Sequence, residues 1–125
     1  MAHEHFKSCI DACNDCALAC DHCAASCLKE QDVAKMARCI RLDIDCAQMC
    51  RLAVAYMARG SELSADVCEL CASICDACAQ ECDKHPMSHC TDCAKACRRC
   101  AEECRRMASD QMRKQSGQRP AASAH

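Results

Sequence analysis

Cysteine recurs every three or four positions along most of this chain, and polar residues fill the positions between. In the first such row, from Cys9 to Cys27, successive cysteines are separated by four, three, four, three and four residues. An α-helix turns once every 3.6 residues or so, so this spacing keeps the side chains on one face. The pattern therefore predicts an amphipathic helix whose buried stripe is made of thiols rather than leucines.

The same pattern returns three more times, twice densely and once thinly. Four rows account for all nineteen cysteines, and every one of them is a candidate metal ligand: Cys9, Cys13, Cys16, Cys20, Cys23 and Cys27; Cys39, Cys46 and Cys50; Cys68, Cys71, Cys75, Cys78 and Cys82; Cys90, Cys93, Cys97, Cys100 and Cys104.

Capping and turn-forming residues divide the chain between these rows. Asp32 is a candidate N-cap, Gly60 suits the left-handed position after a helix end, and Ser61 suits the next N-cap. The pair His85-Pro86 closes the third segment, because a residue before proline is steered away from helical angles. We expect helices at about residues 3–29, 32–59, 62–84 and 86–114, with residues 115–125 as a disordered tail.

Short connections between long helices favour antiparallel neighbours, so the predicted fold is all-α, an up-down-up-down four-helix bundle with the cysteine rows facing inward. A length of 125 residues suits one such domain. A long coiled-coil dimer is the alternative, but Gly60 and Pro86 would each interrupt its helices. A second apolar row beside the cysteines, which includes Ile44 and Leu70, either widens the core or forms a subunit interface.

Composition alone would suggest a secreted disulfide scaffold, since cysteine makes up about 15% of the chain. The cysteine count is odd, the first residues show no signal-peptide pattern, and cysteines one helical turn apart are poorly placed for bridges. We therefore expect free thiols in the cytoplasm. No apolar stretch is long enough for a membrane helix, and a net charge of −2 with interleaved acids and bases indicates neither nucleic-acid nor membrane binding.

Rows of thiolates point to soft metal ions: Cu(I), Zn(II) or iron–sulfur clusters. Zinc sites usually take four tetrahedral ligands from loops, and iron–sulfur sites use compact runs, so continuous rows on rigid helices match neither. Cu(I) accepts two or three thiolates, and one thiolate can bridge two ions. The rows could thus hold multiple Cu(I) ions, about one per cysteine. The positive charge of each ion would then balance the negative charge of one thiolate.

The chain resembles the four-helix-bundle copper storage proteins, and in particular their cytosolic branch. The resemblance covers about residues 3–112 and rests on the dense cysteine rows of the first, third and fourth helices and the sparser second row. It implies cytoplasmic storage or buffering of Cu(I), a homotetramer, and an open end where polar and sulfur side chains admit copper. A copper chaperone or a recipient cuproenzyme would be the natural partner.

In an antiparallel bundle, the ends of the first and third helices meet the starts of the second and fourth at one mouth. His85, Met36 and Met87 each lie three residues from a cysteine of a row, and His89 lies beside one. Imidazole and thioether are softer, weaker ligands suited to passing Cu(I) inward, so we predict copper contacts for all four. The alternatives are a helix-end histidine for His85 and core packing for the methionines.

Asp43 stands on the second helix in the stripe position between Cys39 and Cys46, where another sulfur would fit the row. A buried carboxylate needs a partner, so we predict that Asp43 binds or steers copper or accepts a thiol hydrogen bond. The alternative is that helix rotation leaves it at the rim. Four apolar side chains are expected to close the opposite end of the bundle: Phe6, Tyr56, Met57 and Leu63.

Two other binding functions stay open at this point: a metallothionein-like zinc or cadmium buffer, and a thiol redox buffer or sensor. An enzyme is not expected, because paired Glu-x-x-His motifs for a di-iron bundle and any nucleophile–base constellation are missing from the sequence. We therefore assign no catalytic residue.

Overall fold

The computed structural model describes the backbone of residues 6–118 and the side chains of residues 6–114. In order, the elements are α2 (Lys7–Cys27), the 3₁₀ turn η1 (Val33–Met36), α3 (Ala37–Ala58), α4 (Ser64–Cys82) and α5 (Ser88–Gln118).

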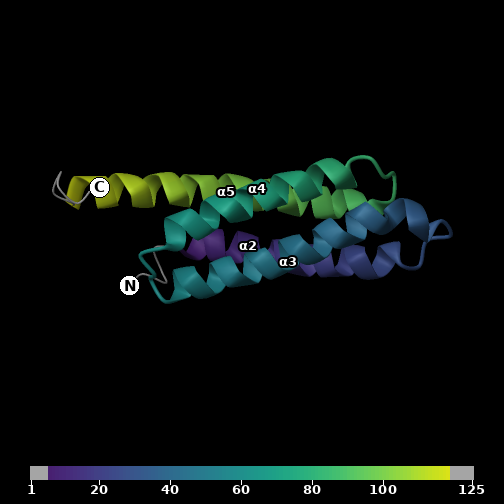
Figure 1. Ribbon diagram of the computed structural model, residues 1–125, viewed down its shortest axis with the longest axis horizontal. Coiled ribbons are helices and arrows are strands. Elements are labelled where there is room, and N and C mark those ends of the chain that lie inside the picture. The colour runs from purple at the N-terminus through teal and green to yellow at the C-terminus, as the bar shows by residue number, and fades with distance from the viewer. Residues whose placement is uncertain (1–5, 119–125) are drawn as a thin grey trace.

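The four long helices lie side by side and alternate in direction (Figure 1). Helix α2 packs on α3, α3 on α4, α4 on α5, and α5 on α2, so the helices close into a ring around one interior. The α2–α3 and α4–α5 connections lie together at one end, which we call the mouth, and the α3–α4 connection lies at the other, the closed end (Figure 1). The predicted all-α, up-down-up-down bundle is confirmed.

All nineteen cysteines point into this interior as free thiols, each with at most 1% of its surface exposed. Buried alanines such as Ala17, Ala72 and Ala79 lie between the sulfurs. Their small side chains let the helices approach closely, and few large apolar residues are then needed to fill the core. The predicted inward orientation of the rows is therefore confirmed.

The second helix starts later than predicted. Asp32 makes no side-chain capping bond, residues Val33–Met36 form a 3₁₀ turn, and the α-helix begins at Ala37. A tighter 3₁₀ turn is a common way to begin a helix, because it satisfies some of the first backbone groups without a side-chain cap.

The third helix also starts later than predicted, at Ser64. Gly60 takes the expected left-handed conformation, with φ of 67°. Ser61 holds the turn that follows rather than capping the helix: its Oγ accepts a bond from the Leu63 backbone N–H at 3.1 Å, and its carbonyl accepts one from the Ser64 hydroxyl at 2.8 Å. The prediction that Ser61 is the N-cap was wrong by two residues.

The last helix continues to Gln118, beyond its predicted end at residue 114. Residues 115–118 of the expected disordered tail are thus helical, and residues 119–125 lie outside the described part of the chain, as do residues 3–5 of the predicted first helix.

At the closed end, Phe6 and Met57 are buried as predicted, but Leu63 is not. Leu63 directly precedes α4, outside the last layer of the bundle, and keeps 51% of its surface exposed. Tyr56 is half-buried, with the Arg59 guanidinium 4.9 Å from the centre of its ring. Phe6 and Met57 therefore close this end without Leu63.

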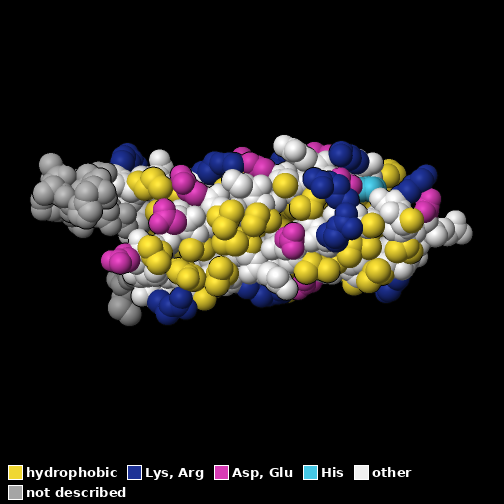
Figure 2. All heavy atoms as spheres, in the orientation of Figure 1, with side chains coloured by type: hydrophobic (Ala, Val, Ile, Leu, Met, Phe, Trp, Pro, Cys, Tyr) yellow, Lys and Arg dark blue, Asp and Glu magenta, His cyan; other side chains and the backbone are white. Residues whose placement is uncertain are grey.

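Hydrophobic side chains gather on the face formed by α3 and α4 (Figure 2). Ile44, Leu52 and Leu70 are 44%, 46% and 55% exposed there, beside a groove lined by Met49 and Ile74. We call these five residues the α3–α4 patch. Within residues 6–118, none of the helices is both long and apolar enough to cross a bilayer.

Candidate metal centre

The sulfur atoms form a continuous column along the bundle axis. Cys46 Sγ lies 3.5 Å from Cys75 Sγ and 3.7 Å from Cys16 Sγ, so three helices meet at this level. Cys16 Sγ in turn lies 3.7 Å from Cys97 Sγ on the fourth helix. Further contacts of 3.5–4.0 Å continue toward both ends of the bundle. The thiols of this column are therefore packed against one another and away from water.

These thiols form overlapping groups of four whose sulfurs all lie within 4.8 Å of one another. One group consists of Cys16, Cys46, Cys50 and Cys75, and a second takes Cys16 and Cys46 again with two other cysteines. Because neighbouring groups share members, separate four-ligand sites cannot all be filled at once. The arrangement suits an ion that binds two or three sulfurs and accepts bridging thiolates, as Cu(I) does.

The charge of the interior also favours a monovalent ion. Among the described residues, the buried polar or charged side chains are Asp43, Ser64 and Glu81, none of which is cationic. One Cu(I) per thiolate leaves such an interior neutral, whereas Zn²⁺ with four thiolates leaves a net charge of −2 in a medium that solvates charge poorly.

Two thiols near the mouth, Cys90 and Cys27, hold their protons at neutral pH. Burial raises the pKa of Cys90 to about 11, and negative charge on Cys39 adds to the effect. Burial likewise raises the pKa of Cys27 above its ordinary value. Thiolate is the form that binds metal, so metal binding by these two thiols near neutral pH must release protons, and its equilibrium improves as pH rises.

Asp43 is fully buried among thiols from three helices, which excludes the rim position. Its Oδ1 accepts hydrogen bonds from Cys78 Sγ on α4 at 3.2 Å and from Cys93 Sγ on α5 at 3.3 Å. Longer contacts join Oδ1 to Cys82 Sγ at 3.8 Å and Oδ2 to Cys39 Sγ at 3.7 Å. Burial, followed by the neighbouring Cys93 and Cys78, raises the pKa of Asp43 to about 11, so its carboxyl group is protonated at neutral pH.

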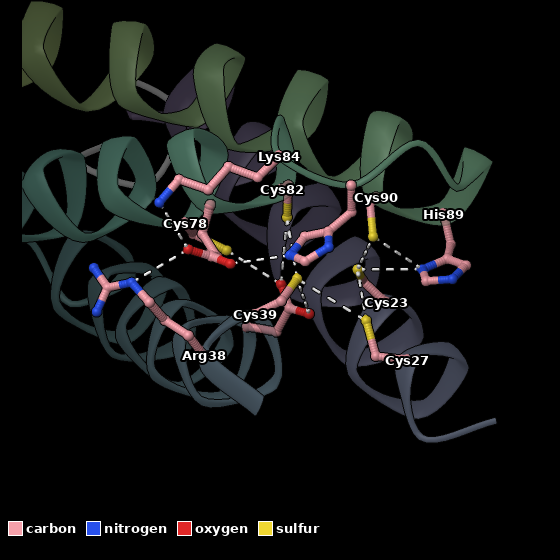
Figure 3. Close-up of polar contacts among 12 residues, drawn as sticks. Cys23, Cys27, Arg38, Cys39, Cys78, Cys82, Lys84, His89 and Cys90 are labelled. Atoms are coloured by element: carbon pink, nitrogen blue, oxygen red, sulfur yellow. Dashed lines mark hydrogen bonds and ion pairs between the residues drawn. The ribbon is translucent and has the colours of Figure 1, made fainter. Parts of the chain in front are cut away.

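His89 is the mouth histidine that contacts sulfur. Its Nδ1 lies 3.4 Å from Cys23 Sγ and 3.5 Å from Cys90 Sγ, as the dashed lines in Figure 3 show. Its other ring nitrogen, Nε2, lies 3.0 Å from Glu30 Oε2. The sequence placed His89 only beside a cysteine row, and the structure brings its ring onto that row.

His85 has a different environment, although it stands on the stripe itself. Its Nε2 lies 2.9 Å from Glu81 Oε2, and among the described residues it makes no hydrogen bond to a sulfur. The other oxygen of Glu81 forms ion pairs with Arg38 Nε at 3.2 Å and Lys84 Nζ at 3.4 Å, without the alignment of a hydrogen bond. Figure 3 shows Arg38 and Lys84 on the opposite side of the mouth from His89.

The two methionines predicted at the mouth pack with the hydrophobic core. Met36 is fully buried in η1, and Met87 is partly buried just before α5. Such packing agrees with the alternative role as core residues. Their contact with copper stays a prediction.

Sequence reasoning missed the two carboxylates that bind the mouth histidines. Glu81 could have been found, because it precedes His85 by only four residues, at the end of the predicted third helix. Glu30 had no such signal, because 59 residues separate it from His89 and only the packing of the bundle brings them together.

A four-helix bundle with a continuous interior column of free thiols defines a protein that binds many soft metal ions. The family model described as copper storage protein matches residues 2–109, and the chain belongs to this family.

Similar proteins include one from Bacillus subtilis known as the uncharacterized cysteine-rich protein YhjQ, which is 49% identical over 65 residues. That match covers 52% of this chain and 60% of the relative, so the chain spans less than two thirds of the curated relative it matches.

Solved structures match over more of the chain. The Cu(I)-bound copper storage protein BsCsp3 is 49% identical, with a TM-score of 0.79, over 86% of this chain and 99% of that one. A cytosolic copper storage protein from Streptomyces lividans, with five coppers, is 38% identical, with a TM-score of 0.82, over 86% of this chain and 95% of that one.

Proposed function

We propose that this chain stores many Cu(I) ions in its interior, about one per cysteine, in the cytoplasm and without catalytic turnover. One observation carries the proposal: nineteen buried free thiols form overlapping groups, and the described residues place no cation among them. The copper-bound relatives and the cytosolic description of the Streptomyces lividans protein support it.

Copper enters at the mouth in this proposal. Two sulfurs and one imidazole nitrogen, from Cys23, Cys90 and His89, lie within 3.8 Å of one another there and offer three soft donors to an arriving ion. Asp43 lies deeper along the column and contacts the next sulfurs inward. His85, Met36 and Met87 flank this entry, and we propose that they guide copper with lower affinity than the thiols.

The assembly is a homotetramer in this proposal, and the α3–α4 patch supports it. Exposed Ile44, Leu52 and Leu70 form a hydrophobic surface that a second copy would cover. Light scattering should then give four times the mass of one chain. Leu70→Glu should lower that mass, whereas Leu18→Glu, which changes a similarly exposed leucine on α2, should not. A monomeric wild-type protein would contradict the proposal.

Copper reaches the protein from a chaperone or leaves it for a cuproenzyme. Both exchanges need a ligand close to the surface, and we propose that His89, with 12% of its side chain exposed, is that ligand. To test the transfer, a copper-loaded chaperone would be mixed with this protein. The two proteins would then be separated and the copper in each measured.

Anaerobic titration of the reduced protein tests the storage function against its alternatives. Cu(I) should bind at about one ion per cysteine, and Zn(II) at far fewer, because separate tetrahedral sites cannot share every sulfur. Saturation by a few Cu(I) ions would contradict storage. Oxidation followed by counting free thiols addresses the redox alternative, which extensive reversible disulfide formation would favour.

A further inference from the structure

Glu30 reaches across the mouth from the turn between α2 and η1 to a histidine at the start of α5. His89 Nε2 lies 3.0 Å from Glu30 Oε2, and both side chains are largely buried, at 12% and 31% exposure. The bond therefore joins two parts of the chain that share no helix. It stands directly behind the imidazole that contacts Cys23 and Cys90.

This arrangement fixes which ring nitrogen can bind metal. A neutral imidazole has one N–H donor and one lone pair. A carboxylate only accepts hydrogen bonds, so Glu30 holds the proton on Nε2 and leaves the lone pair on Nδ1. Nδ1 is the nitrogen that lies 3.4 Å and 3.5 Å from the two sulfurs. A carboxylate behind a ligating histidine generally orients its ring and raises its basicity.

The second carboxylate at the mouth has a different set of contacts. Glu81, in the last turn of α4, binds His85 just beyond the helix end, and it also forms ion pairs with Arg38 and Lys84. Among the described residues, Glu30 forms no ion pair with a lysine or arginine, so its carboxylate serves His89 alone. Glu30 therefore contacts a single histidine, whereas Glu81 also forms ion pairs with two cationic side chains.

We propose that Glu30 is a positioning residue for copper entry: it holds the His89 ring with Nδ1 directed at the Cys23 and Cys90 sulfurs. The inference rests on the proposed storage function for its kinetic consequence. Glu30 sets the rate at which the first ions enter and leaves the number of stored ions unchanged, because the thiols of the column do not contact it.

Stopped-flow mixing with Cu(I) in acetonitrile tests the predicted effect on loading rate. The absorbance of the thiolate-to-copper charge-transfer band monitors the reaction. Glu30→Ala should slow the first phase about 10-fold. Glu30→Gln retains an oxygen acceptor for Nε2–H and should stay within about 2-fold of the wild type. Asp32→Asn is the matched control. It also removes one negative charge, only two residues from Glu30, but the Asp32 carboxylate pairs with Lys35 rather than with a histidine. Final copper content should be equal in all four proteins.

The ¹⁵N chemical shifts of His89 test the positioning part in the metal-free protein, where no copper chemistry is needed. The wild type and Glu30→Gln should show the tautomer protonated at Nε2, and Glu30→Ala should show a mixture. A purely structural role for Glu30 would change the unfolding midpoint without changing the tautomer.

Three results would overturn the inference: an unchanged tautomer in Glu30→Ala, wild-type loading by that variant, or equal slowing by Glu30→Ala and Asp32→Asn. The last would show that negative charge alone attracts copper. A wild-type protein that holds few ions would instead refute storage, and the tautomer result would still decide whether Glu30 orients His89.

Discussion

The two ends of the bundle differ in chemistry although the sulfur column is continuous between them. At the mouth, His85 and His89 are each bound by a carboxylate. At the closed end, Phe6 and Met57 pack over the last thiols. The thiols are buried along the whole length, and the proposed function places copper entry at the polar end. If copper enters there, capacity should depend on the whole column and loading rate on the mouth.

Removing sulfurs near the closed end should give the largest effect and should change capacity alone. Replacing Cys13, Cys71, Cys100 and Cys104, which form one group, by serine should lower copper content by about four ions per chain. The initial loading rate should match that of the wild type, because the mouth is unaltered.

Metal analysis by mass spectrometry measures the content, and stopped-flow absorbance measures the rate. The double variant of Cys23 and Cys90 is the comparison at the mouth, and it should lose about two ions and also load slowly. Undiminished content in the four-cysteine variant would contradict a shared column. Circular dichroism checks that each variant is folded.

Changing the mouth histidines should lower the loading rate and leave the copper content unchanged. His89→Ala should slow the first loading phase about 10-fold with unchanged content, because it removes the nitrogen beside two sulfurs. His85→Ala should have a smaller effect, since its ring is held by Glu81. Stopped-flow traces of both variants show which one loads copper more slowly. Slower loading by His85→Ala would contradict the assignment of His89 as the main entry ligand.

Trimming the buried methionine at the closed end should change stability alone. Met57→Ala should lower the free energy of unfolding of the reduced, metal-free protein by about 2–5 kcal/mol, because it leaves a cavity. Urea unfolding under reducing conditions measures this. Met36→Ala is the matched change at the mouth, where the methionine is equally buried. If Met36 guides copper, only its variant will also load slowly, and equal rates would leave it as a packing residue.

A pH dependence of stability should also arise, from Asp43. Its pKa rises from an ordinary 3.8 to about 11 on folding, so between these values the folded chain keeps a proton that the unfolded chain releases. Stability contributed by this group is therefore complete below pH 3.8 and is lost as pH rises toward 11. Asp43→Asn removes this loss.

Urea unfolding of the reduced, metal-free proteins at pH 5 and pH 8 measures the effect. The stability of Asp43→Asn relative to the wild type should be greater at pH 8 than at pH 5, by up to about 1.4 kcal/mol per pH unit. An equal difference at the two pH values would show that Asp43 does not keep its proton in the fold.

Several predictions from the sequence were accurate because they depend on periodicity alone. Spacings of three and four place every cysteine on an inner face, whichever helices become neighbours. Helix starts were less predictable: Asp32 and Ser61 looked like caps, but a 3₁₀ turn and a serine-held turn satisfy the same backbone groups. Leu63 shows a related difficulty, since its apolar character did not reveal that it lies beyond the last layer of the bundle.

The sequence by itself determined the bundle, the thiol-lined interior and the soft-metal chemistry, because each follows from helical period and side-chain type. Only the tertiary structure decided which histidine meets sulfur and which carboxylate stands behind it. His85 continues the spacing of the third cysteine row but binds Glu81 at the end of α4, whereas the His89 ring contacts two sulfurs and has Glu30 behind it. Such contacts depend on how separate helices rotate and where their loops lie, and a one-dimensional pattern does not contain that information.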